Sequence, residues 1–512
     1  MSGQTSKNAK IAKNTAFLYI RMAVVMFASL YLARVILKVL GIEDYGIYNV
    51  VCGFVFILNV LNLTLSHGVH RYYNEEIGKN NYEGITKVFN SALRIQILII
   101  LVVFLVIETF GLWYIETKMV IAPERLDAAK WVFQFSTLSL ILIILQTPFT
   151  AAILSYERMD YYAYVSIIDV SLKLGVAYLV QIINTDKLIL YGLLMLSVSF
   201  INFILCFGYC KIQFKEIKFT KKIDSSLFKK MLSFSGWLIL EPIAWTMRSH
   251  GCNLVLNIFF GTFVNAAYGI SNQIASALDQ FCSGISTAFK PQLMQSYSSG
   301  EYERTNQLMY SMTKTLFVLK LMICIPVILE IESILTLWLG DTFPSYAITF
   351  TSLTVIVRLI DSLNHPITTV IFATEQIKWY MIITSSLLFS SLPVSYVLFK
   401  FGYNPNYLFI AMIVLTGICQ LVSIELLSRR CSFFNKYDYL KNVIIPCLFH
   451  CIIVLSLSIT ISKLPINHIE RLFAVCISCI LFSMISSYYF VCNKNEKEIA
   501  KKLAYKAINR VK

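Results

Sequence analysis

Charged side chains interrupt the long apolar runs of this 512-residue chain at a small number of positions. Arg21 and Arg34 lie in the first run, and Glu241 and Arg248 lie in the seventh. An ionisable group in the hydrocarbon core of a membrane costs about 2.5–3.5 kcal/mol on insertion scales, so it normally faces a polar cavity or a partner. We therefore expect Arg21 and Arg248 to contact a ligand in a polar cavity, or to pair with Glu241. Arg34 stands nearer the end of its run, where its head group could line the same cavity or reach the lipid headgroups.

A second set of charges has the spacing of an ion pair. Asp169 and Lys173 are four residues apart, so on a helix they share a face. They could pair and so lower the cost of insertion, or serve as a protonation or ion site. Asp279 is a similar case in a later run.

A third set lies where the second apolar run ends, and it comprises His67, His70 and Arg71. His67 and His70 are three residues apart and share a helix face. These residues could receive an anionic group as it enters the membrane, or anchor the end of the helix at the interface.

Composition predicts the elements that position these residues. Hydrophobic residues make up 57% and charged residues 14% of the chain, and the mean hydropathy is +0.67. A soluble domain needs roughly 25% charged residues, and many runs here approach or exceed the ~18 apolar residues that cross a bilayer core. Because a helix satisfies its own backbone groups in lipid, we predict an all-α polytopic membrane protein. Its fourteen expected spans are residues 14–40, 46–70, 85–112, 130–155, 160–183, 188–210, 232–260, 264–289, 310–335, 346–373, 379–401, 405–428, 440–462 and 468–492.

The distribution of Lys and Arg predicts the orientation of these spans. With the N-terminus in the cytoplasm, 29 such residues fall in the inside segments and seven in the outside segments. The ratio favours a multi-pass chain with both termini in the cytoplasm, and it accounts for the net charge of +15 without nucleic acid as a partner. The basic tail would lie against anionic lipid headgroups or remain in solvent.

A short phrase marks an internal repeat. Residues 45–49 read YGIYN, and residues 268–272 read YGISN. Gly41 and Gly261 are 220 residues apart, and Gly78 and Gly300 are 222 apart. Six helices separate the copies, so both halves cross the membrane in the same sense, as in a parallel repeat. The predicted organisation is a six-helix lobe (1–210), a basic cytoplasmic linker (211–231), a second six-helix lobe (232–430), two extra helices (431–492) and a basic tail (493–512).

Several patterns of enzymes are missing from the sequence. No Walker A string is present, so we expect no ATP hydrolysis by that route. Thirteen cysteines are scattered through apolar runs and suggest packing residues rather than a disulfide framework or a metal site. The largest expected outside loop, about residues 113–129, is too short for a folded catalytic domain. We predict no enzyme activity, cofactor or metal, and keep a membrane-embedded transferase or polymerase as the alternative from another class.

Three segments carry a family resemblance. The opening NTAFLYIRMAVVMFASLYLARVILKVLGIEDYGIYNVV has an Asn-Thr entry, an arginine near the end of the first helix and the pattern LG-[IV]-x-x-YG-x-Y. HRYYNEEIGKNN is an arginine-aromatic segment that ends in Glu-x-Gly, and GTFVNAAYGISNQI has the matching turn of the second half. In order and spacing they resemble the Wzx-type polysaccharide flippases of the multidrug/oligosaccharidyl-lipid/polysaccharide exporter superfamily, closely over nine helices and loosely over the last five.

The resemblance implies a MATE-like fold with two lobes around a cavity that opens alternately to each side. It implies a cargo of undecaprenyl diphosphate-linked oligosaccharide, moved across a bacterial inner membrane for surface polysaccharide or O-antigen synthesis. Membrane lipids and other polysaccharide-assembly proteins would be the partners. Arg21 and Arg248 on facing lobes would then hold the diphosphate, because arginine binds phosphate through paired hydrogen bonds. A peptidoglycan-precursor flippase and a cation-coupled multidrug exporter of the same superfamily remain alternatives.

Overall fold

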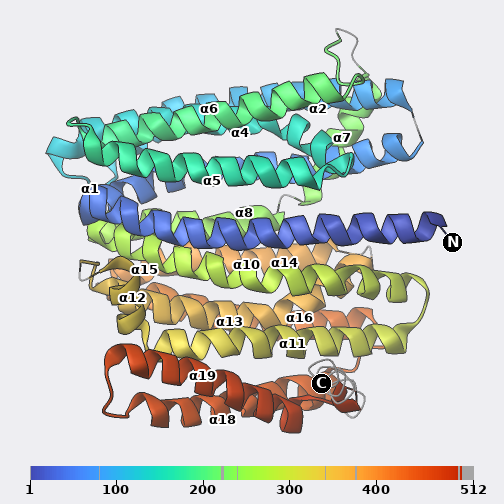
Figure 1. The fold of residues 1–512 in the computed structure, drawn as a ribbon, viewed down its shortest axis with the longest axis vertical. Coiled ribbons are helices and arrows are strands. Elements are labelled where there is room, and N and C mark those ends of the chain that lie inside the picture. Colours follow the sequence, from blue (N-terminus) through green and yellow to red (C-terminus); the bar gives the residue numbers. More distant parts are fainter. Residues whose placement is uncertain are drawn as a thin grey trace. The chain divides into compact units, whose positions relative to one another are not determined.

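The computed structural model describes residues 2–79, 81–220, 224–238, 240–340, 342–374, 377–493 and 496–498. Every regular element within these ranges is helical (Figure 1). Eleven helical stretches among them are long and apolar enough to cross a membrane. The predicted all-α polytopic fold is confirmed.

The helices in chain order are α1 (Ser2–Gly78), α2 (Tyr82–Val106), η1 (Ile107–Gly111), α3 (Leu112–Thr117), η2 (Pro123–Arg125), α4 (Leu126–Ser155), α5 (Met159–Ile182), α6 (Lys187–Gln213), α7 (Ser225–Leu238), α8 (Leu240–Thr246), η3 (Met247–Gly251), α9 (Cys252–Phe260), α10 (Thr262–Ser298), α11 (Tyr302–Leu329), α12 (Ile331–Leu339), α13 (Tyr346–Ala373), α14 (Lys378–Phe389), α15 (Ser391–Lys400), α16 (Tyr407–Arg430), α17 (Lys436–Tyr439), η4 (Leu440–Ile444), α18 (Ile445–Ser462), α19 (His468–Ser486) and η5 (Ser487–Val491). η1, η3, η4 and η5 are single π-turns, and η2 is a 3-10 turn.

One glycine separates the first two predicted spans. Both spans belong to α1, whose backbone leaves the helical region at Gly41, with φ 80° and ψ 172°. Gly261 separates α9 from α10 with nearly the same angles, φ 76° and ψ −173°. Only glycine adopts such a conformation without strain. The equal geometry 220 residues apart supports the predicted repeat. The second helix begins directly after Gly41, so the start predicted at residue 46 is wrong by about one turn.

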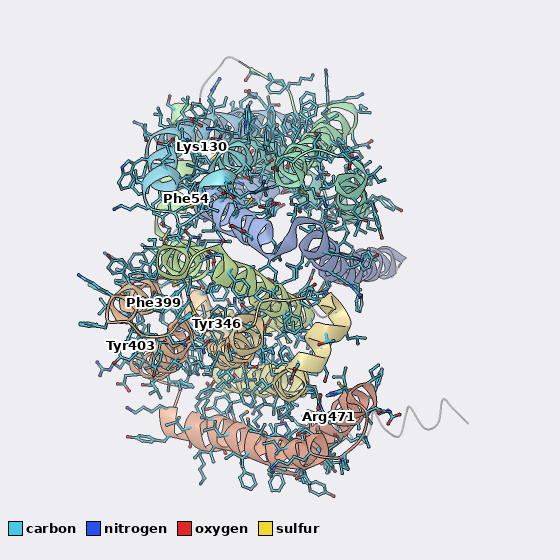
Figure 2. The ribbon with its side chains drawn as sticks, turned by 90° about the vertical axis from the view of Figure 1, so that its left-hand side faces the viewer. Phe54, Lys130, Tyr346, Phe399, Tyr403 and Arg471 are labelled. Atoms are coloured by element: carbon cyan, nitrogen blue, oxygen red, sulfur yellow. The ribbon has the colours of Figure 1, made fainter. Side chains whose placement is uncertain are left out.

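The chain folds into two compact units, which differ from the predicted lobes. In unit 1, α4 packs against α1 and α6 around a core that includes Phe133. α15 packs on α9, where the Phe399 ring lies 5.7 Å from Phe259 and 4.9 Å from Phe260, measured between centroids (Figure 2). The lobe boundaries describe the repeat and stay a prediction. Unit 1 comprises Met1–Gln273, Thr342–Ala347 and Leu388–Leu408, and unit 2 comprises Ile274–Asp341, Ile348–Leu387 and Phe409–Lys512.

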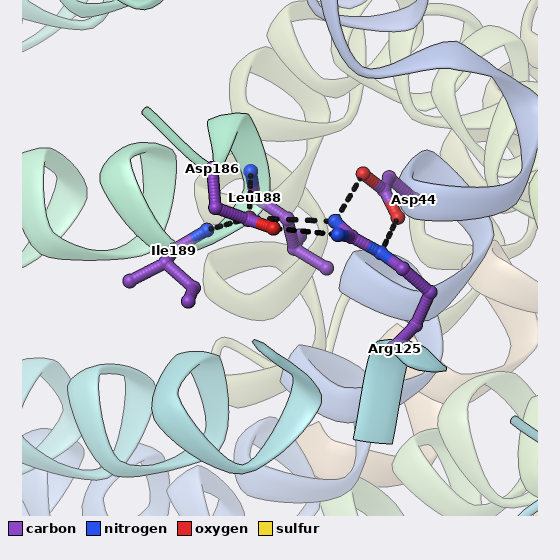
Figure 3. Close-up of polar contacts among 5 residues, drawn as sticks. All are labelled: Asp44, Arg125, Asp186, Leu188 and Ile189. Atoms are coloured by element: carbon purple, nitrogen blue, oxygen red, sulfur yellow. Dashed lines mark hydrogen bonds and ion pairs between the residues drawn. The ribbon is translucent and has the colours of Figure 1, made fainter. Parts of the chain in front are cut away.

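One arginine fastens the turn at Gly41 to the start of α6 (Figure 3). Arg125 Nε donates to Asp44 Oδ1 at 2.8 Å, and Arg125 Nη1 donates to Asp186 Oδ2 at 2.5 Å. Asp186 also caps α6, because it accepts the backbone N–H groups of Leu188 and Ile189. Burial raises the pKa of Asp186, but the hydrogen bonds from Arg125 and Ile189 outweigh it, so the pKa lies below its ordinary value. Asp44 therefore has a structural role in this turn.

The two final helices pack on α11 in unit 2, and polar contacts hold them at its C-terminal end and near its middle. Arg471 of α19 (Figure 2) binds Glu330, with Nε 2.7 Å from Oε1 and Nη2 3.1 Å from Oε2. Glu330 is only 2% exposed, so loss of its partner would leave a buried carboxylate. Near the middle of α11, the buried Lys314 Nζ donates to Asn493 Oδ1 at 3.1 Å. These contacts fix the predicted extra helices to the ninth span.

Candidate functional site

The two copies of the repeated phrase contact each other within unit 1. Gly46 faces the backbone of Thr262, so closely that a Cβ on Gly46 would overlap the carbonyl oxygen. Gly269 faces Asn49, and a Cβ there would come within 2.7 Å of its side chain. Each copy therefore supplies a glycine that permits close approach of the other. In the sequence the phrase marks the internal repeat; in the structure it also forms the contact between the two copies.

A chain of asparagines extends this contact into the interior of unit 1. Asn253 Nδ2 donates to the backbone oxygen of Asn49 at 3.4 Å. Asn265 Nδ2 donates to Asn253 Oδ1 at 2.7 Å, and Asn257 Nδ2 donates to Asn265 Oδ1 at 2.9 Å. Asn257 also accepts the N–H of Val120 at 2.9 Å. Because these amides are buried and bonded, they specify how the segments fit together.

Arg248 lies next to this contact, on the π-turn η3. Its guanidinium carbon is 5.6 Å from the centroid of the Trp245 ring, and the residue is only 4% exposed. On the same turn, His250 lies against helix two of α1: its Nδ1 is 3.3 Å from the Cβ position of Gly53, and its ring stacks on Phe56. π-turns inside membrane helices often occur at functional sites. The part of α1 that follows Gly41 therefore packs directly on His250 of this turn.

The other predicted ligand-binding residues are not gathered at one place by described contacts. The side chains of Arg21 and His67 lie outside the described part of the structure. Arg34 and Arg71 are exposed. His70 Nδ1 is 3.4 Å from Ser155 Oγ of α4, a contact within the first lobe. The pairing of Arg21 with Arg248 around a diphosphate stays a prediction, and so does the role of His67, His70 and Arg71.

Asp169 and Lys173 form the ion pair that their spacing allows. Lys173 Nζ lies 2.7 Å from Asp169 Oδ2, and Asn202 of α6 donates to the other carboxylate oxygen at 2.7 Å. Both oxygens of Asp169 are thereby bonded, which suits a structural pair between α5 and α6. Glu241, the other member of the predicted lumen set, is half-buried on α8.

Asp279 belongs to a cluster of four charges in unit 2. Lys320 of α11 donates to Asp279 Oδ1 at 2.8 Å, and Arg358 Nε of α13 is 3.5 Å from Asp279 Oδ2. Arg358 Nη1 is also 3.7 Å from Asp361 Oδ2. Lys320 is 6% exposed and donates to the backbone oxygen of Arg358 at 3.1 Å as well. Two cations and two carboxylates from three helices thus balance one another inside the membrane domain.

A family model, MatE, matches residues 18–179 and again residues 238–397, well over half of the chain. The chain belongs to the MatE family. The two matched stretches begin 220 residues apart, the interval that separates Gly41 from Gly261. The repeat seen in the MatE matches and the repeat seen in the turns therefore have the same period.

Solved structures at low identity share the fold of this MatE protein. Lipid II flippase MurJ in an inward closed conformation matches with a TM-score of 0.68 and 14% identity, over 94% of this chain and 98% of that chain. An inward-facing multidrug resistance MATE transporter of the MOP superfamily matches with a TM-score of 0.66 and 14% identity, over 80% and 98%. A MOP superfamily transporter from Pyrococcus furiosus matches with a TM-score of 0.59 and 15% identity, over 82% and 96%. A comparison with curated protein sequences gave no match.

These findings give the MatE protein the fold of a multi-pass membrane transporter. Its family and its structural relatives are transporters and flippases, in line with the prediction that it is not an enzyme. The Wzx-type resemblance agrees with them at the level of the superfamily.

Sequence reasoning missed Lys320 of the MatE protein. This lysine stands in the apolar run LFVLKLMICIPV, and the criterion that selected Asp279 also applies to it. The pairing of Arg358 with Asp361 was visible from their spacing of three residues. The pairing of Asp279 with Lys320 was not, because it depends on how α10 and α11 are rotated toward each other.

Proposed function

We propose that this protein is a flippase that moves undecaprenyl diphosphate-linked oligosaccharide from the inner to the outer leaflet of a bacterial inner membrane. The observation that carries the proposal is Arg248, a permanently charged residue that is 4% exposed within a helix of a membrane transporter fold. An ionisable residue at such a position normally lines a ligand pathway or pairs with another charge, and an anionic cargo group is a ligand that suits an arginine. A diphosphate offers the paired oxygens that guanidinium binds best, and it is common to all lipid-linked oligosaccharides of this kind.

The two final helices favour a flippase over a drug exporter. The lipid II flippase structure matches 94% of this chain, whereas the MATE transporter structures match 80–82%. The difference in coverage is similar to the fraction of this chain that follows residue 430. A flippase must accommodate a long lipid tail beside its cavity, and the additional helical pair on α11 would extend the surface available to it. The peptidoglycan-precursor flippase is the second candidate, since its cargo presents the same diphosphate.

The proposed mechanism is alternating access between the two repeat copies. Separation of Gly46 from Thr262 and of Asn49 from Gly269 would open the outer side, and closure would restore those contacts. Arg248 is two residues from His250, which touches Gly53, so this movement would change how Arg248 meets its ligand. The arginine would bind the diphosphate in one state and release it in the other. Arg21 would take part from the first lobe, while His67, His70 and Arg71 would receive the diphosphate at the inner leaflet.

We propose that Asp279, rather than Asp169, couples transport to an ion gradient. The Asp279 cluster joins three helices and contains two cations, so protonation of one carboxylate would change the attraction between those helices. Asp169 is bonded on both oxygens within the first lobe, which favours a structural role. Glu241 remains a candidate partner for Arg21 or Arg248. Both termini would lie in the cytoplasm, and other polysaccharide-assembly proteins would act on the same cargo.

A gene deletion tests the function. We expect loss of surface polysaccharide with accumulation of the lipid-linked unit on the inner leaflet. Intact polysaccharide with altered drug sensitivity would instead identify an exporter, and a peptidoglycan defect would identify the precursor flippase. Complementation then tests the site: Arg248→Ala should abolish export, Arg248→Lys should restore part of it, and Arg304→Ala at an exposed position should behave as wild type. Normal export by a well-expressed Arg248→Ala variant would refute the role of Arg248.

A further inference from the structure

The start of the predicted cytoplasmic linker, in the loop between α6 and α7 (Figure 1), is bound to α2 by side-chain hydrogen bonds at successive turns of the helix. Thr86 Oγ1 donates to the backbone oxygen of Glu216 at 2.6 Å, and Asn90 Nδ2 donates to that of Lys218 at 2.7 Å. Asn90 Oδ1 accepts the N–H of Thr220 at 2.8 Å. Further along α2, the Arg94 guanidinium donates to the backbone oxygen of Thr220 at 3.0 Å. Residues 214–220 are therefore held in one place, and together with the last turn of α6 (211–213) they are here called the linker segment.

The spacing explains why the segment follows the helix. Thr86, Asn90 and Arg94 are four residues apart, which is about 6 Å per step along a helix. The backbone oxygens they bind belong to alternate residues, and two residues of extended chain span about 6.6 Å. The two spacings match over the two steps from Thr86 to Arg94, so each turn of α2 can bind the next accessible carbonyl group.

Apolar side chains fix the other face of the linker segment. Phe214 and Ile217 are buried in the core of unit 1, and the Phe214 ring stacks on Tyr156 at 4.2 Å between centroids. Phe219 meets the edge of Phe89 at 5.3 Å yet remains 62% exposed. Lys211, Lys215 and Lys218 are exposed, and Glu216 is the only acidic residue among positions 211–220. The segment thus presents three lysines and one large aromatic ring on a fixed backbone.

The position of the segment along α2 places it at the edge of the hydrocarbon layer. After Tyr82 at the start of α2, the next exposed large hydrophobic side chains on this helix are Ile97 and Leu98, three to four residues beyond Arg94. This is about one helical turn past the bond between Arg94 and Thr220. An exposed aromatic ring such as Phe219 at this depth is typical of the membrane–water interface. The lysines therefore stand at the level of the lipid phosphate groups.

We propose that the linker segment is a binding site for the phosphate groups of anionic phospholipids, with Lys211, Lys215 and Lys218 as the ligands. Basic residues near a membrane surface attract anionic lipids cumulatively. Because the hydrogen bonds to α2 already order the backbone, little conformational freedom is lost when a lipid binds. The site is separate from any cargo site and does not depend on the proposed function.

The test is a lipid titration of the purified full-length protein by native mass spectrometry, with phosphatidylglycerol and phosphatidylcholine as probes. The triple variant Lys211→Gln, Lys215→Gln, Lys218→Gln should lower the preference for phosphatidylglycerol by about fivefold per lysine, on the order of 100-fold in total at low salt. The matched control Lys187→Gln, Lys400→Gln, Lys463→Gln removes three exposed lysines elsewhere and should leave most of the preference. Asn90→Ala removes two bonds to the segment and should lower the preference while every lysine is kept.

Four results would each overturn the proposal. An unchanged preference in the linker triple variant would show that the anionic lipid binds elsewhere. An equal loss in both triple variants would show a general effect of net charge. Displacement of phosphatidylglycerol by equimolar farnesyl diphosphate would show that the segment prefers an isoprenoid diphosphate, as an entry site for cargo would. An unchanged preference in Asn90→Ala would refute the fixed backbone as the cause of binding.

Discussion

The close approach of Gly46 to Thr262 makes a strong and testable prediction. Gly46→Ala would place a methyl group on the carbonyl oxygen of Thr262, a backbone atom that cannot rotate away. Overpacking of this kind costs about 1–3 kcal/mol. The better helix propensity of alanine returns up to ~1 kcal/mol. We therefore expect a net loss of stability on the order of 1–2 kcal/mol.

Alanine substitutions at two further glycines serve as comparisons for Gly46→Ala. Gly269→Ala overlaps the side chain of Asn49, which can rotate but then loses its 2.7 Å bond to the Tyr45 oxygen, so its cost should be smaller, about 1 kcal/mol. Gly175 on α5 is exposed and has no atom within 4 Å of its Cβ position, so Gly175→Ala should be neutral or stabilising by up to ~1 kcal/mol. The three variants should therefore rank in the order Gly175, Gly269 and Gly46 from most to least stable.

The assay is unfolding of the purified full-length variants in one detergent, followed by loss of a folded-state signal with rising temperature or denaturant. The protein could accommodate the new methyl group by separating the two copies or by distorting the backbone where it stands. Either response loses native contacts, so both would lower the unfolding midpoint. A Gly46→Ala variant as stable as Gly175→Ala would refute the close contact between the copies.

Three other changes should have measurable effects on the same unfolding midpoint. Lys320→Met leaves two membrane carboxylates with one cation fewer, so it should lower the midpoint more than Lys173→Met, whose pair is local to one helix and more exposed; an equal effect would contradict the cluster. His450→Phe should cost about 1–3 kcal/mol, because both ring nitrogens bond to serine hydroxyls of the neighbouring helix α19 that would lose their partner; a neutral result would count against those bonds. The pKa of Asp186 in the folded protein lies below the ordinary 3.8, so its contribution to stability is complete well above pH 3.8 and is lost as the pH falls through the lower folded value. Asp186→Asn should therefore reduce the loss of stability on acidification below about pH 4, and an unchanged acid profile would refute this.

The sequence predicts the helices and their turns well because the signals are local. The length of each apolar run sets a span, and a glycine with positive φ sets the turns at Gly41 and Gly261. The ion pair of Asp169 and Lys173 was predictable for the same reason, since both residues belong to one turn of one helix. Fold class and repeat therefore follow from patterns within a few residues or from the interval between them.

Contacts between distant segments could not be predicted in this way. The partner of Asp44, Arg125, is 81 residues away and also binds Asp186. Lys320 and Asp279 are 41 residues apart and meet only because two helices are rotated toward each other. The linker appeared as a run of lysines, whereas its binding to α2 depends on backbone carbonyl groups that every residue carries. In each case helix packing determines which residues become partners. No pattern in a single sequence predicts that packing.

The contact of Gly46 with Thr262 and of Gly269 with Asn49 resembles the interface of a dimer whose two subunits have been joined into one chain. In a dimer of separate subunits, an interface that opens in every cycle must still be strong enough to prevent dissociation. A linker between the halves removes that requirement, because it keeps them at an effective concentration in the millimolar range even when the contact is broken. The contact through Gly46 and Gly269 can therefore be as weak as rapid opening needs. Fusion also frees the two halves to diverge, so that Gly46 meets a backbone and Gly269 meets a side chain.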